Sequence, residues 1–188
     1  MSKRNKLSKF EDIMSYPNVY QNFSPKEIKP MGQGGKVVQL KGKWAEHFGD
    51  QKPITLELAC GRGEYTVQLA RDYSDRNFIG VDVKGARIWK GATMALSEGL
   101  DNVAFMRTKI EVIEEFFAPN EISEIWITFA DPFLGKPNRR LTAPDFHDRY
   151  KRMLIDGGVV NMKIDDPTLY EFTKEVLAER DDVKILYD

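Results

Sequence analysis

The sequence PITLELACGRGEYTVQLA at residues 53–70 joins a short apolar run to a segment with helical spacing, through a turn that contains Gly61 and Gly63. The run at 53–59 is β-branched and apolar, as a buried strand is. After the turn, apolar residues recur every three or four positions, which is typical of an amphipathic helix. The stretch therefore predicts one strand–turn–helix unit of an α/β fold.

The same alternation continues along the chain. Further apolar runs predict strands at residues 77–83, 102–106, 124–130, 157–163 and 182–187. Helical spacing predicts helices at residues 64–73, 86–99, 110–117, 143–154 and 166–179. Such alternation favours a doubly wound, mostly parallel sheet with helices on both faces.

The N-terminal part of the chain has a different composition. Residues 1–42 are rich in Pro, Gly and Lys and predict an irregular basic arm, followed by a short helix near 43–48 that opens the α/β domain of residues 43–188. The basic residues of the arm, Lys3, Arg4, Lys6 and Lys9, offer a contact for RNA, although flexible basic arms are common in any protein.

Composition limits the functional classes. The chain has 188 residues, 41% of them hydrophobic, which suits one globular domain. One cysteine and two distant histidines predict neither a disulfide nor a metal site. No apolar run resembles a membrane span or a signal peptide, so we expect a cytoplasmic protein. With a net charge of −1, attraction to nucleic acid must come from local basic patches.

Ligands of doubly wound sheets bind beyond the carboxyl ends of the strands. The turn after the first predicted strand has Gly61 and Gly63, but Thr66 occupies the third glycine position of a dinucleotide fingerprint, which disfavours NAD. Glu57 lies within that strand and Asp82 ends the next one. Two carboxylates suit a ligand with a ribose and a cationic group and disfavour one with a pyrophosphate. S-adenosylmethionine has a ribose, an ammonium and a sulfonium, and no phosphate. The alternative is that the glycines only close a βα turn.

The stretch WITFADPFLGKPNRRL at residues 126–141 carries the second group of polar residues. Asp131 follows the fourth predicted strand, where its carboxylate is placed to hold the N–H edge of a substrate. Lys136, Arg139 and Arg140 follow, and such cations suit phosphate oxygens of a nucleic acid. In the alternative interpretation Asp-Pro is an ordinary turn and the cations lie on a solvated face.

Together these segments resemble the bacterial tRNA (guanine-N7)-methyltransferases. The resemblance is carried by PITLELACGRGEYTVQLA, NFIGVDVK, ITFADPF with KPNRRLTAPDF, and NMKIDDPTLYEF, and it runs from about Lys43 to Leu177. It implies a Rossmann-like methyltransferase sheet with S-adenosylmethionine as cofactor and tRNA as partner.

The resemblance also implies roles for single residues. The implied cofactor-binding residues are Glu57, Gly61, Gly63 and Asp82. Asp131 lies where cofactor and guanine meet, Lys136, Arg139 and Arg140 contact tRNA, and Lys163 and Asp165 match a block that is associated with the substrate base. Lys109 and Ile164 depart from the family pattern, which predicts altered cofactor affinity.

Three questions stay open at this level. Relatives in this family continue beyond the predicted strand at 182–187, so we expect a sheet that lacks its last strand, with a partner subunit as one way to cover the edge. A non-catalytic RNA-binding protein or subunit that retains the fold is an alternative to the enzyme, as is a methyltransferase for small molecules. The sequence is compatible with a monomer or a homodimer.

Overall fold

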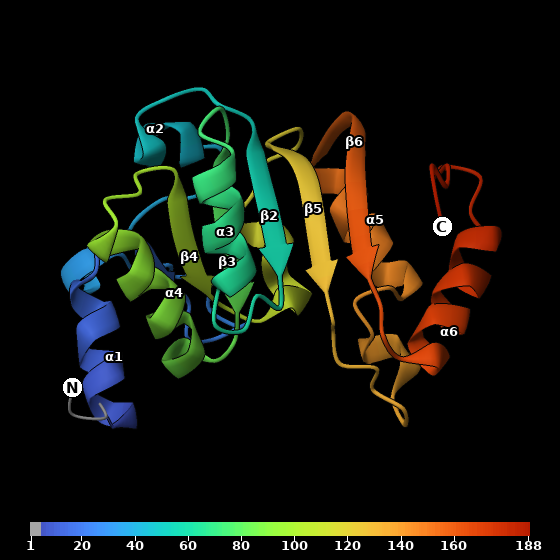
Figure 1. Cartoon of the computed structure of the whole chain (residues 1–188), viewed down its shortest axis with the longest axis horizontal. Helices are drawn as coiled ribbons and strands as arrows, with labels where there is room; N and C mark the ends of the chain where they lie inside the picture. Colours follow the sequence, from blue (N-terminus) through green and yellow to red (C-terminus); the bar gives the residue numbers. More distant parts are fainter. Residues whose placement is uncertain (1–4) are drawn as a thin grey trace.

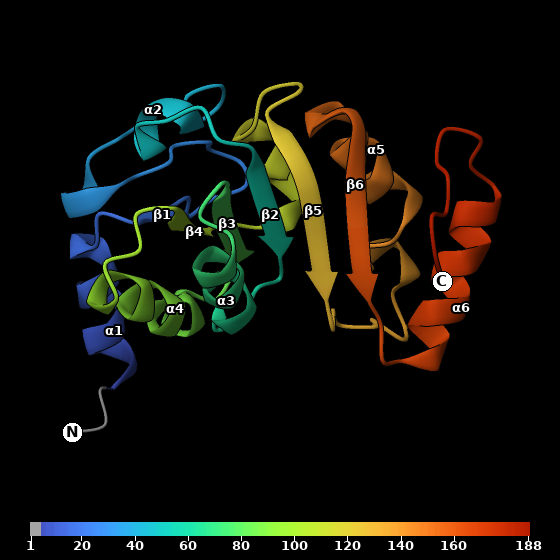
Figure 2. The ribbon, with the colours of Figure 1, turned by 45° about the horizontal axis from the view of Figure 1, so that its top comes forward.

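The computed structural model describes residues 5–188, which form a six-stranded, all-parallel sheet with the strand order β1-β4-β3-β2-β5-β6 (Figures 1 and 2). The strands are β1 Val19–Gln21, β2 Ile54–Leu58, β3 Asn77–Asp82, β4 Val103–Arg107, β5 Ile122–Thr128 and β6 Leu154–Lys163. The predicted doubly wound, Rossmann-like class is confirmed, as are the five strands predicted between residues 53 and 163.

Helices lie on both faces of this sheet. The α-helices are α1 Lys6–Ser15, α2 Trp44–Phe48, α3 Glu64–Asp72, α4 Gly85–Ser97, α5 Pro144–Met153 and α6 Pro167–Ala178. Three short 3₁₀ turns span Gln33–Gly35, Ile110–Glu115 and Pro137–Arg139. The segment predicted as a helix at 110–117 is one of these turns, because Val112 has φ −120° and breaks α-helical geometry. β-Branched side chains at three of its six positions disfavour a regular helix there.

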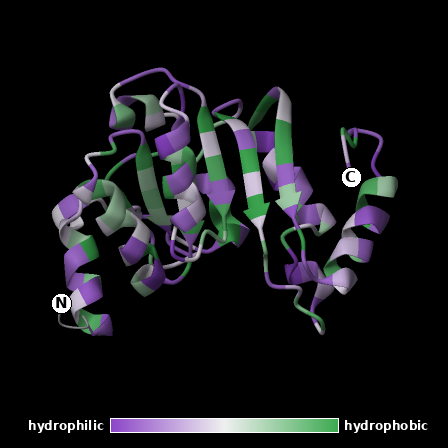
Figure 3. Cartoon of the chain, in the orientation of Figure 1, coloured by the Kyte–Doolittle hydropathy of each residue, from purple (hydrophilic) through white to green (hydrophobic). Residues whose placement is uncertain are grey.

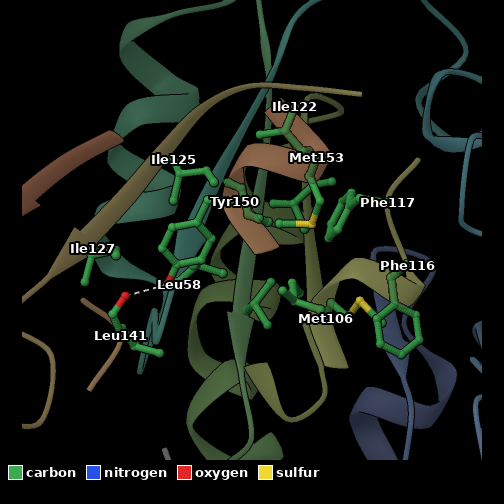
Figure 4. Packing of buried hydrophobic residues seen from close by; sticks show 14 of the residues in the cluster. Leu58, Met106, Phe116, Phe117, Ile122, Ile125, Ile127, Leu141, Tyr150 and Met153 are labelled. Carbon is green, nitrogen blue, oxygen red and sulfur yellow. Dashed lines mark hydrogen bonds between the residues drawn. The ribbon is translucent and has the colours of Figure 1, made fainter. Parts of the chain in front are cut away.

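Two apolar clusters hold the layers together. On one face, α3, α4 and α1 pack against the sheet through a cluster that includes Val67 of α3, Ile88 of α4 and Phe105 of β4. On the other face, α5 packs over Leu58, Ile125 and their neighbours (Figure 4). Side chains alternate between the two faces along each strand, so β2 sends Leu56 and Leu58 to the second cluster and Glu57 to the first face. In Figure 3 the strands carry the hydrophobic colouring, whereas the helices show interleaved hydrophilic bands.

The expectation of an irregular arm over residues 1–42 is wrong for residues 6–21, which contain α1 and β1, whereas residues 22–42 are largely irregular apart from the 3₁₀ turn at Gln33–Gly35. Asn5 caps α1 by accepting a hydrogen bond from the Ser8 amide at 2.9 Å, and α1 packs against α4. β1 pairs with β4 and completes the sheet. The amphipathic helix α1, which has Phe10 and Ile13 on its buried side, was not predicted from the sequence because this region has a basic composition. The predicted RNA contacts Lys3 and Arg4 lie outside the described residues.

The predicted strand at 182–187 is also wrong. Residues 181–188 are irregular, and the side chains of Ile185, Leu186 and Tyr187 are exposed. The segment is held by side chains instead, since the Tyr187 hydroxyl donates to Asn161 Oδ1 at 2.7 Å. An isolated strand is unstable unless a neighbour pairs with its backbone, and no described segment pairs with this one. Among the described residues no helix has the length and apolar character needed to cross a bilayer.

Candidate active site

The loops after β2, β3 and β5 leave the sheet at one edge, which we call the carboxyl edge. β2 pairs in parallel with both β3 and β5, with Leu58 opposite Val81 on one side and Ile127 on the other. The turn at Gly61, the end of β3 and the loop that carries Asp131 therefore emerge side by side. Figure 1 shows the arrowheads of β2, β5 and β6 pointing the same way.

The two glycines after β2 have different surroundings. Gly61 has φ +59°, and a Cβ added to it would meet nothing within 4 Å. Gly63 has φ +69°, but a Cβ there would lie 2.8 Å from Phe105 Cζ and 3.3 Å from Gly91 Cα. Gly63 is therefore required for the close packing of α3 on α4 and β4, whereas Gly61 leaves open space above its backbone.

Asp82 joins the turns that follow β2 and β3. Its carboxylate accepts hydrogen bonds from the Gly61 amide at 3.0 Å and from the Lys84 amide at 2.7 Å, and its residue is only 7% exposed. Each carboxylate oxygen has a second lone pair, so Asp82 can still accept from the hydroxyl groups of a ligand. This arrangement fixes the carboxylate before any ligand arrives.

Glu57 is the most buried carboxylate of the edge, with 3% exposure. One oxygen accepts from the Thr66 hydroxyl and the other from Thr128 Oγ1 at 2.8 Å. Burial raises the pKa of Glu57 above its ordinary value, while these two hydrogen bonds act in the opposite direction. No described Lys, Arg or His forms an ion pair with this carboxylate. An unpaired buried carboxylate at a ligand-binding edge suits a cationic group.

A third part of the edge lies beyond β3 and β4. Asn22, Phe23, Pro25, Val83, Arg107, Thr108 and Lys109 line a small cavity there. The Thr108 hydroxyl is buried, with 1% exposure of its residue, and has no hydrogen-bond partner among the described residues. The Arg107 guanidinium lies over the rings of Phe10 and Phe23, at 5.1 and 4.8 Å from their centroids. Residues from the N-terminal segment thus form one wall of the edge.

The loop after β5 is exposed. Asp131 accepts a hydrogen bond from the Phe133 amide through Oδ1 at 2.9 Å, and Oδ2 has no partner among the described residues. Two residues of this loop, Phe129 and Phe133, have left-handed backbone angles of φ +51° and +40°. Left-handed backbone is costly for bulky residues and concentrates at functional sites.

The three predicted RNA-binding cations differ in exposure and in their contacts. Lys136 and Arg139 are exposed, and the Arg139 guanidinium covers the Phe133 ring at 5.1 Å. Arg140 is only 5% exposed; its Nε donates to the Pro132 carbonyl at 2.7 Å and its guanidinium covers the Phe172 ring at 4.4 Å. Arg140 therefore holds the loop in place, and this placement does not favour the predicted phosphate contact.

The end of β6 supplies the remaining predicted residues, Lys163 and Asp165. Both are exposed, and the Lys163 ammonium lies over the rings of Tyr65 and Trp126, at 4.7 and 5.6 Å. The backbone carbonyl of Lys163 accepts from the Phe129 amide at 2.8 Å, which ties the loop after β5 to the end of β6. No described group of three His, Cys, Asp or Glu residues is close enough to hold a metal ion.

Sequence reasoning missed several residues of this edge. Thr66 and Thr128 hold Glu57, and Thr128 was part of a predicted strand with no role assigned to its hydroxyl. Thr108 and the Phe23–Arg107 wall were missed because no sequence motif marks them. The usable signal for Thr128 was its position, one residue after the core residue Ile127 and therefore facing the opposite side of the sheet.

Sequence comparison identifies the family. A family described as putative methyltransferase matches residues 51–188. The chain belongs to this family. Three relatives named tRNA (guanine-N(7)-)-methyltransferase come from Bacteroides fragilis, with 47% identity over 94% of this chain and 68% of the relative, from Bacteroides thetaiotaomicron, with 48% over 93% and 67%, and from Christiangramia forsetii, with 49% over 94% and 78%.

Solved structures of other methyltransferases share the fold. The aminoglycoside resistance methyltransferase NpmB1 aligns with a TM-score of 0.55 at 19% identity over 82% of this chain and 77% of the other. The antibiotic-resistance methyltransferase Kmr aligns with a TM-score of 0.54 at 18% identity over 82% and 79%. These distant likenesses concern the fold alone, and they agree with the methyltransferase family membership.

Proposed function

We propose that this methyltransferase transfers a methyl group from S-adenosylmethionine to N7 of a guanine in tRNA. The observation that carries the proposal is the carboxyl edge, where two buried carboxylates beside an open glycine turn adjoin an exposed carboxylate and two exposed cations. The names of the three relatives supply the reaction class.

The residues of the edge fit the cofactor. Glu57 suits the ammonium of S-adenosylmethionine, and Asp82 suits the two ribose hydroxyls. The open space above Gly61 allows a ligand to approach the backbone, and the unpaired Thr108 hydroxyl offers a hydrogen bond beyond β4. A pyrophosphate does not fit, because two buried carboxylates would repel it. When bound, the cofactor supplies a methyl group on a positively charged sulfur.

The chain needs little acid–base chemistry for this reaction. N7 of neutral guanine carries a lone pair, so methyl transfer depends on alignment and not on removal of a proton. Oδ2 of Asp131 is free to accept from the N–H edge of the base. The same carboxylate stabilises the positive charge that develops on the purine. Asp131 is therefore our proposed catalytic residue.

RNA binding falls to exposed cations near this site. The exposed side chains of Lys136 and Arg139 suit contacts with phosphate, and Arg140 keeps their loop in position. Lys163 and Asp165 are exposed at the end of β6, which the Phe129 amide ties to the same loop. Unstacking a guanine from the tRNA body costs on the order of a few kcal/mol. Phosphate contacts offset part of this cost. We expect a cytoplasmic protein, where tRNA is found, that acts as a monomer or a homodimer.

One experiment tests the function directly. The protein is incubated with S-adenosylmethionine labelled on its methyl group and with unmodified tRNA, and N7-methylguanine is mapped by borohydride reduction and aniline cleavage. We expect label at a guanine N7 with chain cleavage at that position. Label at another atom, or none, contradicts the proposal. Calorimetric titration with S-adenosylmethionine then separates a non-catalytic RNA-binding protein, which gives no heat, from an enzyme that acts on another substrate.

A further inference from the structure

Phe129 combines two unfavourable features at the centre of the carboxyl edge. Its residue is 64% exposed, and its backbone is left-handed, with φ +51°. Exposure of a large aromatic ring forgoes hydrophobic stabilisation, and a left-handed backbone is a genuine outlier for a bulky residue. Because both the exposed ring and the left-handed backbone of Phe129 disfavour folding, this conformation indicates a role other than stability.

The left-handed backbone is what turns the ring out of the protein. Ile125 and Ile127 face the large apolar cluster, so an extended residue 129 would face it as well. The positive φ interrupts this alternation and leaves the ring in solvent. The Phe129 amide donates to the Lys163 carbonyl at 2.8 Å, so the turned backbone is fixed by β6.

The free ring face distinguishes Phe129 from the other aromatic residues of this edge. A cation already covers the rings of Phe23, Tyr65, Trp126, Phe133 and Phe172. No cation and no second ring lies on Phe129 among the described residues. Phe129 therefore presents an open π surface.

The surroundings of that surface select a planar ligand with an N–H edge. Phe129 precedes Asp131 by two residues and directly follows β5, which lies between β2, the strand that carries Glu57, and β6. Asp131 Oδ2 is an unpaired acceptor on the same loop. A flipped nucleobase needs a stacking surface for its face and hydrogen-bonding groups for its edge. The loop offers both within three residues.

We propose that Phe129 is the platform on which the target guanine stacks when it leaves the tRNA body. This inference rests on the proposed function and adds the residue that holds the face of the base. Asp131 then holds the N–H edge, and the phosphate contacts of Lys136 and Arg139 hold the flanking backbone. Stacking replaces part of the base stacking that the guanine loses on leaving the RNA.

The test compares variants that keep or remove the ring. Phe129→Leu keeps an apolar side chain without a π face, and Phe129→Tyr keeps the face. We expect Phe129→Leu to lower kcat/KM for tRNA about 10- to 100-fold, Phe129→Tyr to retain it within about threefold, and both to bind S-adenosylmethionine as the wild type does. The matched control is Leu134→Ala on the same loop, whose side chain is also exposed and has no left-handed backbone; we expect it to be near wild type.

A spectroscopic measurement reports on stacking itself. 2-Aminopurine replaces the guanine mapped in the labelling experiment, and its fluorescence is followed as protein is added. We expect a change on flipping with the wild type and a distinctly brighter bound state with Phe129→Leu, because the ring no longer quenches the base. Equal kcat/KM and equal fluorescence for wild type and Phe129→Leu overturn the platform. A loss of thermal stability or of cofactor binding in Phe129→Leu also overturns it, since the ring is then structural. Absence of methyl transfer by the wild type rejects the proposed function instead.

Discussion

The carboxyl edge has two halves that are built differently. The proposed cofactor half, formed by the ends of β2, β3 and β4, contains the open turn at Gly61 and the buried polar side chains of Glu57, Asp82 and Thr108. The proposed substrate half, formed by the ends of β5 and β6, contains Phe129, Asp131, Lys136, Arg139, Lys163 and Asp165, all exposed. In the first half hydrogen bonds of the fold fix the carboxylates. In the second half the charged groups are exposed and form no ion pairs with described residues, and Asp131 Oδ2 and the Phe129 ring have no partner among them.

This difference indicates how the two ligands are recognised. A small cofactor gains from a buried and rigid site, because the ordering of the side chains is complete before it binds. A tRNA covers a large surface and brings its own charge, so exposed groups on a loop are suitable contacts. Substitutions in the cofactor half should therefore alter cofactor affinity or folding, and substitutions in the substrate half should alter transfer or RNA binding alone.

The largest effect is expected for Asp131→Ala. Loss of the carboxylate removes the acceptor for the base and the stabilisation of the developing charge, so we expect a fall of about 10³-fold in the single-turnover rate. Folding and tRNA affinity should change little, because Asp131 is exposed and bonds only to the Phe133 amide. Asp101→Ala, an exposed carboxylate in the loop before β4, is the matched control. Equal rates for wild type and Asp131→Ala would falsify the assignment.

A pair of glycine variants tests whether the cofactor half is shaped by packing or by the ligand. Both positions have positive φ, so Gly61→Ala and Gly63→Ala share the backbone strain of about 1–2 kcal/mol. Only Gly63→Ala adds a collision with Phe105, which raises the expected loss of unfolding free energy to about 3 kcal/mol. Urea unfolding measures both. Gly61→Ala should instead weaken S-adenosylmethionine binding, and equal destabilisation by the two variants would contradict this division of roles.

Glu57→Gln should weaken the binding of the cofactor and raise the free energy of unfolding. Loss of a charge-assisted hydrogen bond to the ammonium predicts a rise of about 10- to 100-fold in the dissociation constant for S-adenosylmethionine. Burial raises the pKa of Glu57 in the folded protein above its ordinary value of 4.5. Between the pKa of Glu57 in the unfolded chain and its higher pKa in the folded protein, the folded state binds more protons than the unfolded state. The unfolding free energy therefore falls as the pH rises through that window.

The matched measurement is therefore the pH dependence of stability. Calorimetry gives the cofactor affinity, and urea unfolding at pH 4.5 and pH 7.5 gives the stability. We expect the stability of Glu57→Gln relative to the wild type to increase from the lower to the higher pH. Thr55→Val, a buried polar position on the same face of β2, controls for general effects of substitution in this strand. If the stability of Glu57→Gln relative to the wild type does not increase from pH 4.5 to pH 7.5, burial of the charged Glu57 does not destabilise the folded protein.

The RNA contacts of the substrate half predict a smaller, salt-dependent effect. Lys136→Ala combined with Arg139→Ala removes two exposed cations, so the slope of log K against log salt for tRNA should fall by about 1.4 to 1.8. Arg140→Ala should leave that slope unchanged, because Arg140 is buried against Pro132 and Phe172. Filter binding at several salt concentrations measures the slopes. A reduced slope for Arg140→Ala would return this residue to the RNA-binding set.

The sequence predicted those features that depend on short-range patterns. The strand at 53–59, the Gly61 turn and Asp82 at the end of the next strand follow from alternation and turn chemistry, and the structure places Gly61 against Asp82. Residues 19–21 and 182–187 were misjudged because pairing decides strand formation: Val19–Gln21 pairs with β4, whereas 182–187 pairs with no described strand. Arg139 and Arg140 cannot be distinguished in the sequence, because both are cations of the same loop. Only the structure shows that Arg140 packs against Phe172 and is buried.

Thr108 is the clearest case of a proposed site residue without a sequence signal, and the smallest effect is expected for its substitution. Its buried hydroxyl has no partner among the described residues. Thr108→Val should therefore leave the unfolding free energy unchanged or slightly higher, because it removes an unsatisfied polar group. If the cofactor supplies the missing partner, its dissociation constant should rise about fivefold, which corresponds to about 1 kcal/mol. Thr173→Val is the matched control, since that buried hydroxyl already bonds to Thr142 and to the Leu169 carbonyl. The control should lose stability and keep its affinity, so opposite outcomes for the two threonines would show that the cofactor half extends to the end of β4.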